Sequence, residues 1–226
     1  ALSWWGQQLL GVGVVLVWLA LVAGLALVVR SRWPEWGEGS RKVVHIGSGP
    51  VVLLAWWLAI DRGIALAAAS LISLLAAWNH RRRTLPGLED VDRHSYGTVA
   101  YGASITLLLL LWWPRQPLPV AAGVLVMAFG DGLAGLLGRQ LHSFSWTLLG
   151  QRRSLVGTAS MAVVSLLVLL GLAQAAAAFA QPAPPIPALA VIGLIATLLE
   201  QLAIGGLDNL TVPLAVGWLW SLWSLA

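Results

Sequence analysis

The sequence predicts an all-α, polytopic membrane protein that forms a single integral membrane domain over residues 1–226, with about eight transmembrane helices. Hydrophobic residues make up 59% of the chain and charged residues only 10%, and the mean hydropathy of +0.84 is high for a soluble domain. In addition, apolar segments of about 20 residues, the length that crosses about 30 Å of hydrocarbon, recur along the whole chain.

Composition also excludes several kinds of site. The chain has no cysteine, which excludes disulfides, thiolate metal sites and cysteine nucleophiles. The formal net charge of +4 comes from a few basic residues that lie mainly between apolar segments. This pattern indicates orientation in a membrane and predicts no nucleic-acid partner.

Four apolar segments in the first half of the chain are expected to span the bilayer. They lie near residues 8–29, 43–60, 63–79 and 97–113. The first has no basic stretch before it and is longer than the apolar core of a signal peptide, so we expect an uncleaved span. Only Asp61, Arg62 and Gly63 separate the second from the third, which predicts a tight helical hairpin.

The second half of the chain has four further apolar segments. They lie near residues 118–138, 155–180, 187–204 and 207–225. Prolines at 114, 117 and 119 mark the break before the first of them, and the cluster Pro182–Pro187 marks another. The last two are separated at Gly205 and Gly206, which predicts a second hairpin.

Charge distribution orients these spans. If successive spans alternate in direction, eleven of the thirteen basic residues share one side, and only Arg62 and Arg115 lie opposite. The shared side carries Arg30, Arg32, Arg41, Lys42, Arg81, Arg82, Arg83, Arg93, Arg139, Arg152 and Arg153. The positive-inside rule makes that side cytoplasmic and predicts that both termini are non-cytoplasmic.

Three carboxylates lie within or at the ends of apolar segments. A charge in hydrocarbon costs several kcal/mol unless it is paired, hydrated or bound to a cation, so Asp131, Glu200 and Asp208 are candidate catalytic residues. A buried ion pair between helices is the structural alternative. Glu200 and the Asp208-Asn209 pair flank the Gly205-Gly206 turn, and such a set of oxygens suits Mg²⁺ that carries nucleotide phosphates.

Small residues recur three and four positions apart in the segment from Gly130 to Arg139, which contains Asp131. Such a helix face allows the close approach of another helix or of a phosphate. Helix packing alone accounts for the glycines but leaves the aspartate unexplained. We therefore keep Asp131 as a site residue.

A polar segment precedes the sixth span. It places Arg152, Arg153, Ser154 and Gly157 beside the start of a long apolar helix, where backbone N–H groups and guanidinium groups bind anionic oxygens. A simple positive anchor at the membrane surface is the alternative, but it would not need the serine or the glycine.

Other basic segments differ in what they predict. Arg41 and His45 are four residues apart and share a helical face, so both can address one anionic or hydroxylic group. A structural histidine is the equal alternative. The Arg81–Arg83 run is better explained as an anchor to anionic lipid, and the acids of the Glu89–Arg93 loop are better explained as solvated groups.

Several motifs together resemble the polyprenol kinase family, the CTP-dependent membrane lipid kinases that include dolichol kinase, phytol kinase and yeast-type diacylglycerol kinase. The matching segments, which run in the family's order from about residue 30 to the C-terminus, are Arg41-Lys42-x-x-His45, Tyr96-Gly97-Thr98, Gly130-Asp131-x-x-Ala134-x-x-x-Gly138-Arg139, Arg153-Ser154-x-x-Gly157-Thr158 and Asp208-Asn209-x-x-x-Pro213. Within that family the resemblance is closest to the phytol kinases of cyanobacteria and plastids.

The resemblance implies an enzyme that transfers the γ-phosphoryl group of CTP to the hydroxyl of phytol, for tocopherol and related prenyl-lipid synthesis, with Mg²⁺ as cofactor. It implies a plasma or thylakoid membrane of a cyanobacterium, or a plastid membrane, with the isoprenoid alcohol arriving from the lipid. The implied catalytic residues are Asp131, Glu200, Asp208 and His45, with Asp131 and Asp208 as metal ligands. The implied nucleotide-binding residues are Arg41, Lys42, Arg139, Arg152, Arg153, Ser154, Gly157 and Asn209.

The chain departs from the family pattern in one loop. Related kinases usually have Lys-Ser-x-Glu-Gly where this chain has Arg153-Ser154-Leu155-Val156-Gly157. Arginine preserves the positive charge, but Val156 removes a carboxylate.

Two other functions are compatible with these residues. A related CTP-dependent enzyme, either a dolichol or diacylglycerol kinase or a cytidylyltransferase, would have a similar site. A transporter would also have carboxylates in glycine-broken helices. The chain has no internal repeat, and its polar residues gather at one membrane face, which favours an enzyme.

Overall fold

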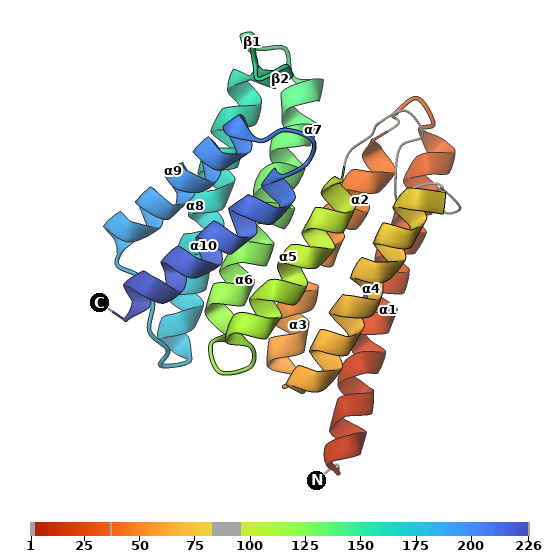
Figure 1. Ribbon diagram of the computed structural model, residues 1–226, viewed down its shortest axis with the longest axis vertical. Helices are drawn as coiled ribbons and strands as arrows, with labels where there is room; N and C mark the ends of the chain where they lie inside the picture. The colour runs from red at the N-terminus through yellow and green to blue at the C-terminus, as the bar shows by residue number, and fades with distance from the viewer. Residues whose placement is uncertain (1–2, 37, 83–95, 226) are drawn as a thin grey trace.

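The computed structural model describes residues 3–36, 38–82 and 96–225, and the described chain is helical apart from one short hairpin and the connections (Figure 1). The first helices are α1 (Trp4–Arg32), α2 (Gly39–Ser48), α3 (Val51–Trp57), α4 (Arg62–Arg82) and α5 (Gly97–Trp112). The remaining elements are α6 (Pro117–Leu125), the π-helical turn η1 (Val126–Asp131), α7 (Gly132–Gln140), strands β1 (Ser145–Leu148) and β2 (Gln151–Ser154), α8 (Leu155–Ala178), α9 (Ile186–Leu202) and α10 (Asp208–Ser224). The Glu89–Arg93 loop and Arg83 lie outside the described residues.

Four helical stretches are long and apolar enough to cross a membrane, judged by length and composition. They are α1, α4, α8 and the continuous stretch Pro117–Gln140, which combines α6, η1 and α7. α5 and α9 are apolar but shorter. In a bilayer every backbone polar group must be satisfied within the protein, and a helix achieves this within its own segment. The apolar composition therefore accounts for the helical fold.

The second expected span, residues 43–60, is divided into two helices instead of one. α2 ends at Ser48 and α3 begins at Val51, with Gly49 and Pro50 between them. Proline has no backbone N–H and its ring crowds the preceding turn, so a regular helix is interrupted there. Both residues keep helical backbone angles, and α2 and α3 therefore follow one another as a bent pair.

The stretch from α6 to α7 is the centre of the bundle. Every residue of α6 is buried, and the helix packs against α5, α8 and α10. At Gly123 an added Cβ would collide with the backbone oxygen of Pro213, and at Gly217 it would lie 2.9 Å from the oxygen of Pro119. These glycines allow α6 and α10 to approach backbone to backbone. The π-helical turn that follows, a feature often found at functional sites, ends at Asp131.

A β-hairpin that was not expected from the sequence connects α7 to α8. β1 and β2 are antiparallel, and Leu149 and Gly150 form the two-residue turn with φ of 50° and 74°. Positive φ at both positions is the requirement of a type I′ hairpin turn. The polar segment before the sixth span therefore contains a strand, Gln151–Ser154, which pairs with Ser145–Leu148.

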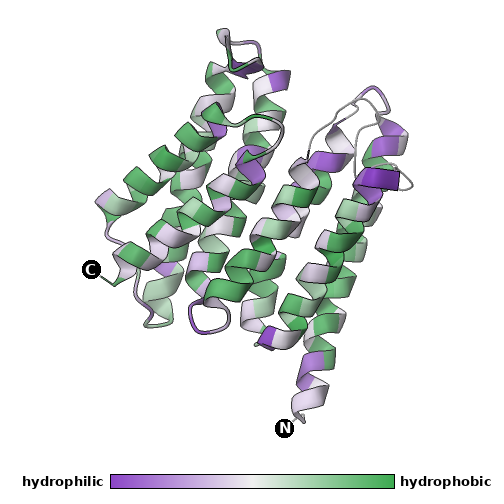
Figure 2. Ribbon diagram, in the orientation of Figure 1, coloured by the Kyte–Doolittle hydropathy of each residue, from purple (hydrophilic) through white to green (hydrophobic). Residues whose placement is uncertain are grey.

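Polar and apolar residues are segregated along the molecule (Figure 2). The bodies of the helices are largely apolar, and hydrophilic residues gather near helix ends and at the hairpin. The chain termini and the α3–α4 and α5–α6 connections lie away from the hairpin end of the molecule (Figure 1). The hairpin end also holds the starts of α2 and α10 and the ends of α7 and α9, so candidate residues far apart in the sequence meet there.

Candidate active site

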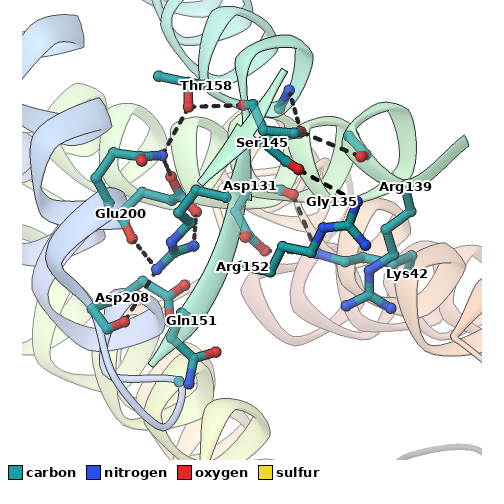
Figure 3. A pocket seen from close by; sticks show the side chains of 18 of the residues that line it. Lys42, Asp131, Gly135, Arg139, Ser145, Gln151, Arg152, Thr158, Glu200 and Asp208 are labelled. Carbon is teal, nitrogen blue, oxygen red and sulfur yellow. Dashed lines mark hydrogen bonds and ion pairs between the residues drawn. The ribbon is translucent and has the colours of Figure 1, made fainter. Parts of the chain in front are cut away.

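A polar cavity of about 660 Å³ opens at the hairpin end (Figure 3). Its walls come from α2, η1, α7, the hairpin, α8, α9 and the start of α10. The predicted site residues that line it are Arg41, Lys42, Asp131, Arg139, Arg152, Arg153, Ser154, Gly157, Glu200, Asp208 and Asn209. His45 is the exception, because it lines a smaller neighbouring hollow.

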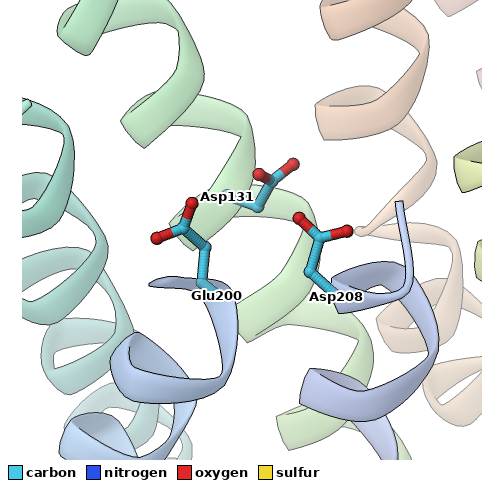
Figure 4. A group of neighbouring side chains, drawn as sticks. All are labelled: Asp131, Glu200 and Asp208. Atoms are coloured by element: carbon cyan, nitrogen blue, oxygen red, sulfur yellow. The ribbon is translucent and has the colours of Figure 1, made fainter. Parts of the chain in front are cut away.

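Three carboxylates that line this cavity converge (Figure 4). Asp131 ends η1, Glu200 lies in the last turn of α9 and Asp208 begins α10, and each offers an oxygen within 4.8 Å of the other two. Negative charges this close repel one another unless cations balance them. Oxygen donors in such an arrangement suit a hard cation such as Mg²⁺.

Asp131 is held by two basic side chains of α2. Lys42 Nζ donates to Asp131 Oδ2 at 2.9 Å and to the Asp131 backbone oxygen at 3.2 Å. His45 Nε2 lies 3.4 Å from the same carboxylate oxygen and 3.1 Å from the backbone oxygen of Met127. Both of these oxygens are acceptors only, so Nε2 of His45 carries a proton. His45 therefore donates this proton to the Met127 backbone oxygen, with the Asp131 carboxylate beside it.

Glu200 is held in a different way. The Arg153 guanidinium donates to Glu200 Oε1, to the Glu200 backbone oxygen at 2.6 Å and to the backbone oxygen of Ala203 at 3.1 Å. These two carbonyls belong to the C-terminal end of α9, where helical carbonyl groups lack intrahelical partners and a cation is favourable. Arg153 thus joins strand β2 to the end of α9.

Asp208, the third carboxylate, is held by its neighbour Asn209. Asp208 Oδ1 accepts from the Asn209 backbone N–H at 3.0 Å and from Asn209 Nδ2 at 3.2 Å. Asp208 occupies the first turn of α10, where the helix dipole favours negative charge. The preceding turn places Gly205 and Gly206 at φ of 63° and 87°, a backbone region that glycine adopts at little cost.

The glycines of α7 serve close packing around Asp131. A Cβ on Gly135 would lie 2.7 Å from Cε and Nζ of Lys42, and one on Gly138 would lie 3.1 Å from Cα of Gly157. Gly135 therefore leaves space for the lysine that contacts Asp131, and Gly138 lets α7 touch the start of α8. Of the two explanations for this small-residue face, close helix packing is the one that the contacts support directly.

Ser154 caps the N-terminus of α8. Its Oγ accepts from the Gly157 N–H at 3.2 Å and donates to the Gly138 backbone oxygen at 3.2 Å. An N-cap serine satisfies one of the N–H groups that a helix leaves unpaired at its start. Val156, the position of the departure from the family pattern, lies in the first turn of this helix but does not line the cavity.

Glu38 was not predicted as a site residue. It precedes α2 and makes ion pairs with Arg41, at 3.3 Å, and with Arg139 at the end of α7. The carboxylate thereby fixes two of the predicted phosphate-binding arginines at one wall of the cavity. Only its spacing of three residues from Arg41 is visible in the sequence, and nothing there points to Arg139.

Gln201 is a second residue that the sequence did not identify. Its Nε2 donates to Thr158 Oγ1 at 3.0 Å and to Glu200 Oε2 at 2.7 Å. Glu200 therefore has a polar partner on each carboxylate oxygen, Arg153 on one and Gln201 on the other. A glutamine next to an acidic residue at the end of an apolar helix was the available signal.

Comparisons with known proteins agree in pointing to one family. Phytol kinase of Synechocystis sp. is 37% identical over 206 residues, which are 91% of this chain and 88% of that protein. The probable chloroplastic phytol kinase 1 of Glycine max is 30% identical over 197 residues, which are 78% of this chain and 64% of that protein. Phytol kinase 1 of Arabidopsis thaliana, also chloroplastic, is 26% identical over 197 residues, 78% of this chain and 63% of that protein. No family model and no solved structure matches the chain.

Proposed function

Because this chain belongs to the phytol kinase family, we propose that it phosphorylates the hydroxyl of phytol at the polar cavity, with CTP as phosphoryl donor. The observation that carries this proposal is the arrangement of the cavity itself, where three carboxylates and several cations gather at one end of an apolar bundle. A charged nucleotide and a lipid alcohol need such a boundary in order to meet.

The cations of the cavity would bind the triphosphate. Arg41 and Arg139, which Glu38 holds, and the exposed Arg152 each present a guanidinium group, whose planar fork matches phosphate oxygens. Lys42 would contact a phosphate oxygen from the side of Asp131. Phosphoryl transfer depends mainly on positioning and on neutralising charge, which these groups supply.

The carboxylates fit a divalent cation by the chemistry of their donor set. Asp131 and Asp208 would hold Mg²⁺, and Glu200 lies within the same 4.8 Å cluster. When bound, Mg²⁺ would neutralise and orient phosphate oxygens of the nucleotide. Glu200 is already hydrogen-bonded to Arg153 and Gln201, so its role would be to shape the cluster.

The reaction forms a bond between the alcohol oxygen and the γ-phosphorus and breaks the bond from that phosphorus to the bridging oxygen. A nucleoside diphosphate leaves, and the hydroxyl proton is transferred to a base. We assign that proton to Asp131, because Lys42 and His45 both contact its Oδ2, and within the described residues no hydrogen bond occupies its Oδ1. His45, whose Nε2 lies 3.4 Å from Asp131 Oδ2, would limit the positions that the carboxylate can take.

In the membrane, we propose eight passes, with the cavity on the cytoplasmic side and both termini on the other. The basic residues on the cavity side and the positive-inside rule support this orientation. CTP would then reach the cavity from the cytoplasm, and phytol would arrive from the bilayer.

The deciding experiment uses the purified protein in detergent with phytol, Mg²⁺ and CTP radiolabelled separately at the α- and γ-phosphates. We expect the γ-label alone to appear in the lipid. The α-label in the lipid would show cytidylyl transfer, and neither label, with several prenols tested, would refute both kinds of chemistry. ATP, GTP and UTP, each at the concentration of CTP, test the nucleotide preference.

A further inference from the structure

A smaller hollow adjoins the polar cavity. It has a volume of about 60 Å³ and is lined by Arg41, Val44, His45, Ser48, Gly97, Thr98, Tyr101 and Asn209. Arg41 and Asn209 also line the large cavity, so the two spaces share these side chains as a common wall. Asp131 faces the large cavity and contacts His45, which lines the small one.

Tyr101 contributes to the small hollow a hydroxyl group that has few hydrogen-bond partners. The residue is only 8% exposed, and its ring lies against that of His45 with centroids 4.6 Å apart. Within the described residues, the hydrogen-bond partner of the Tyr101 hydroxyl is Ser48 Oγ. The two oxygens are 3.5 Å apart, which is longer than a normal O–H···O hydrogen bond. Ser48 gives its own proton to the His45 backbone oxygen at 2.9 Å. Ser48 Oγ can then accept the Tyr101 proton only over this long contact, and an acceptor that enters the hollow more closely would take that proton instead.

The size and position of the hollow limit what it can hold. A water molecule in the liquid takes about 30 Å³, so 60 Å³ holds a group of only a few atoms. α2 packs chiefly on α1, α7 and η1, whereas α5 packs chiefly on α4, α6 and α10. The helices α2 and α5 therefore meet through side chains such as those of His45 and Tyr101, without close backbone packing.

We propose that this small hollow is the acceptor subsite, which binds the hydroxyl end of a lipid alcohol while its chain extends between α2 and α5 into the bilayer. Tyr101 donates a hydrogen bond to the alcohol oxygen, and Val44 contacts the carbon that carries it. The alcohol then lies on the His45 side of Asp131 and the phosphates lie on the Lys42 side. This inference rests on the proposed function and adds to it the place and orientation of the acceptor.

Filling the hollow tests the proposal. Val44→Phe is expected to raise KM for phytol at least tenfold and to leave KM for CTP within twofold of the wild type. Val43→Phe is the matched control, since Val43 is the neighbouring residue of α2 and lines neither cavity. An equal effect of the two variants on KM for phytol would overturn the subsite.

Tyr101→Phe supplies a second variant that keeps the ring against His45. Loss of one hydrogen bond to the substrate is worth about 1 kcal/mol, so we expect kcat/KM for phytol to fall about fivefold to tenfold, with the thermal unfolding midpoint unchanged. Wild-type kcat/KM in this variant would remove Tyr101 from the subsite. This variant decides the question if Val44→Phe does not fold.

Direct labelling separates this inference from the proposed function. A phytol analogue with a diazirine beside the hydroxyl-bearing carbon should label residues 39–48 or 97–112, and Val44→Phe should abolish that labelling. Labelling of other segments only would overturn the subsite, even if phytol is phosphorylated. Labelling of these helices, competed by phytol, in a protein that transfers no γ-phosphate to any prenol would support the subsite and refute the kinase.

Discussion

Asp131 and Glu200 each contact a cation, but Asp131 is partly exposed, Glu200 is buried, and their surroundings differ. Asp131 accepts a hydrogen bond from Nζ at the end of the flexible Lys42 side chain, and Gly135 leaves the space in which that side chain lies. Glu200 is bound by a planar guanidinium, and Arg153 makes its other two hydrogen bonds to backbone carbonyls at the end of α9. Asp131 also contacts His45, at the boundary between the two hollows.

This difference indicates that one ion pair serves the reaction and the other serves the structure. A lysine ammonium is a point charge on a flexible stem and can exchange its carboxylate for a phosphate oxygen, whereas a planar arginine with three acceptors is fixed. We infer that the Asp131–Lys42 pair takes part in the reaction and that the Glu200–Arg153 pair fastens the hairpin to α9. Substitutions on each side should therefore change different measured quantities.

The largest effect is expected for Asp131→Asn. Asparagine keeps an oxygen for Lys42 but removes the base and a metal ligand, so turnover of phytol should fall by a factor of roughly 10² to 10⁴. The thermal unfolding midpoint in detergent should change little. Turnover near that of the wild type would remove Asp131 from the reaction.

Arg153→Met should instead lower stability. It leaves Glu200 buried without its cation, and breaking a buried pair in this way costs about 3 kcal/mol. The measurement is the free energy of unfolding in detergent, with the double variant Arg153→Met, Glu200→Gln expected to recover part of the loss.

Arg152→Met is the matched control for that prediction. Arg152 is the neighbouring residue of β2 but is exposed, and its contact to Ser145 Oγ is 3.4 Å long. We expect a stability change within about 0.5 kcal/mol and a severalfold rise in KM for CTP. Equal destabilisation by the two variants would contradict the structural role of Arg153.

Asp208→Asn tests the metal. An amide is a weaker ligand for Mg²⁺ than a carboxylate, so the Mg²⁺ concentration that gives half-maximal activity should rise about tenfold. Glu200→Gln should raise it less, because Arg153 and Gln201 already occupy the Glu200 oxygens. If Glu200→Gln raised this Mg²⁺ concentration more than Asp208→Asn did, Glu200 would be the metal ligand and Asp208 would shape the cluster.

The smallest effect is expected for Gly135→Ala. The new Cβ would displace the end of the Lys42 side chain, which moves at little cost, so activity should fall severalfold without loss of stability. Gly171→Ala in α8 is the control, because nothing lies within 4 Å of its added Cβ. Alanine favours the helix there by about 0.5–1 kcal/mol, and activity should not change.

Much of the fold could be predicted, because each prediction depended on local sequence. The helical regions and the turn at Gly205 and Gly206 follow from apolar length and from glycine at a chain reversal. The break at Pro50 was missed although proline was visible, because hydropathy averages over a whole window and does not register one lost donor. The β1–β2 hairpin was missed because each strand has only four residues, too few for a strand pattern to stand out.

The candidate site was only partly predictable for a similar reason. Asp131, Glu200 and Asp208 could be selected because each is a charge in an apolar setting. The different surroundings of Arg152 and Arg153 could not be predicted. Successive residues of a strand point to opposite faces, and the strand itself was not expected. Glu38 and Tyr101 were missed because their partners, Arg139 and His45, are distant in the sequence.

By itself the sequence determined that the chain folds as apolar helices and which charged groups need partners, because the cost of burying backbone and charge in lipid depends on local composition. Only the tertiary structure decided which partner each charge obtained, because that depends on how closely helices approach at positions such as Gly123, Gly135 and Gly138. It also placed two adjoining hollows on either side of the contact between Asp131 and His45, an arrangement that required α2, η1 and α5 to be packed together.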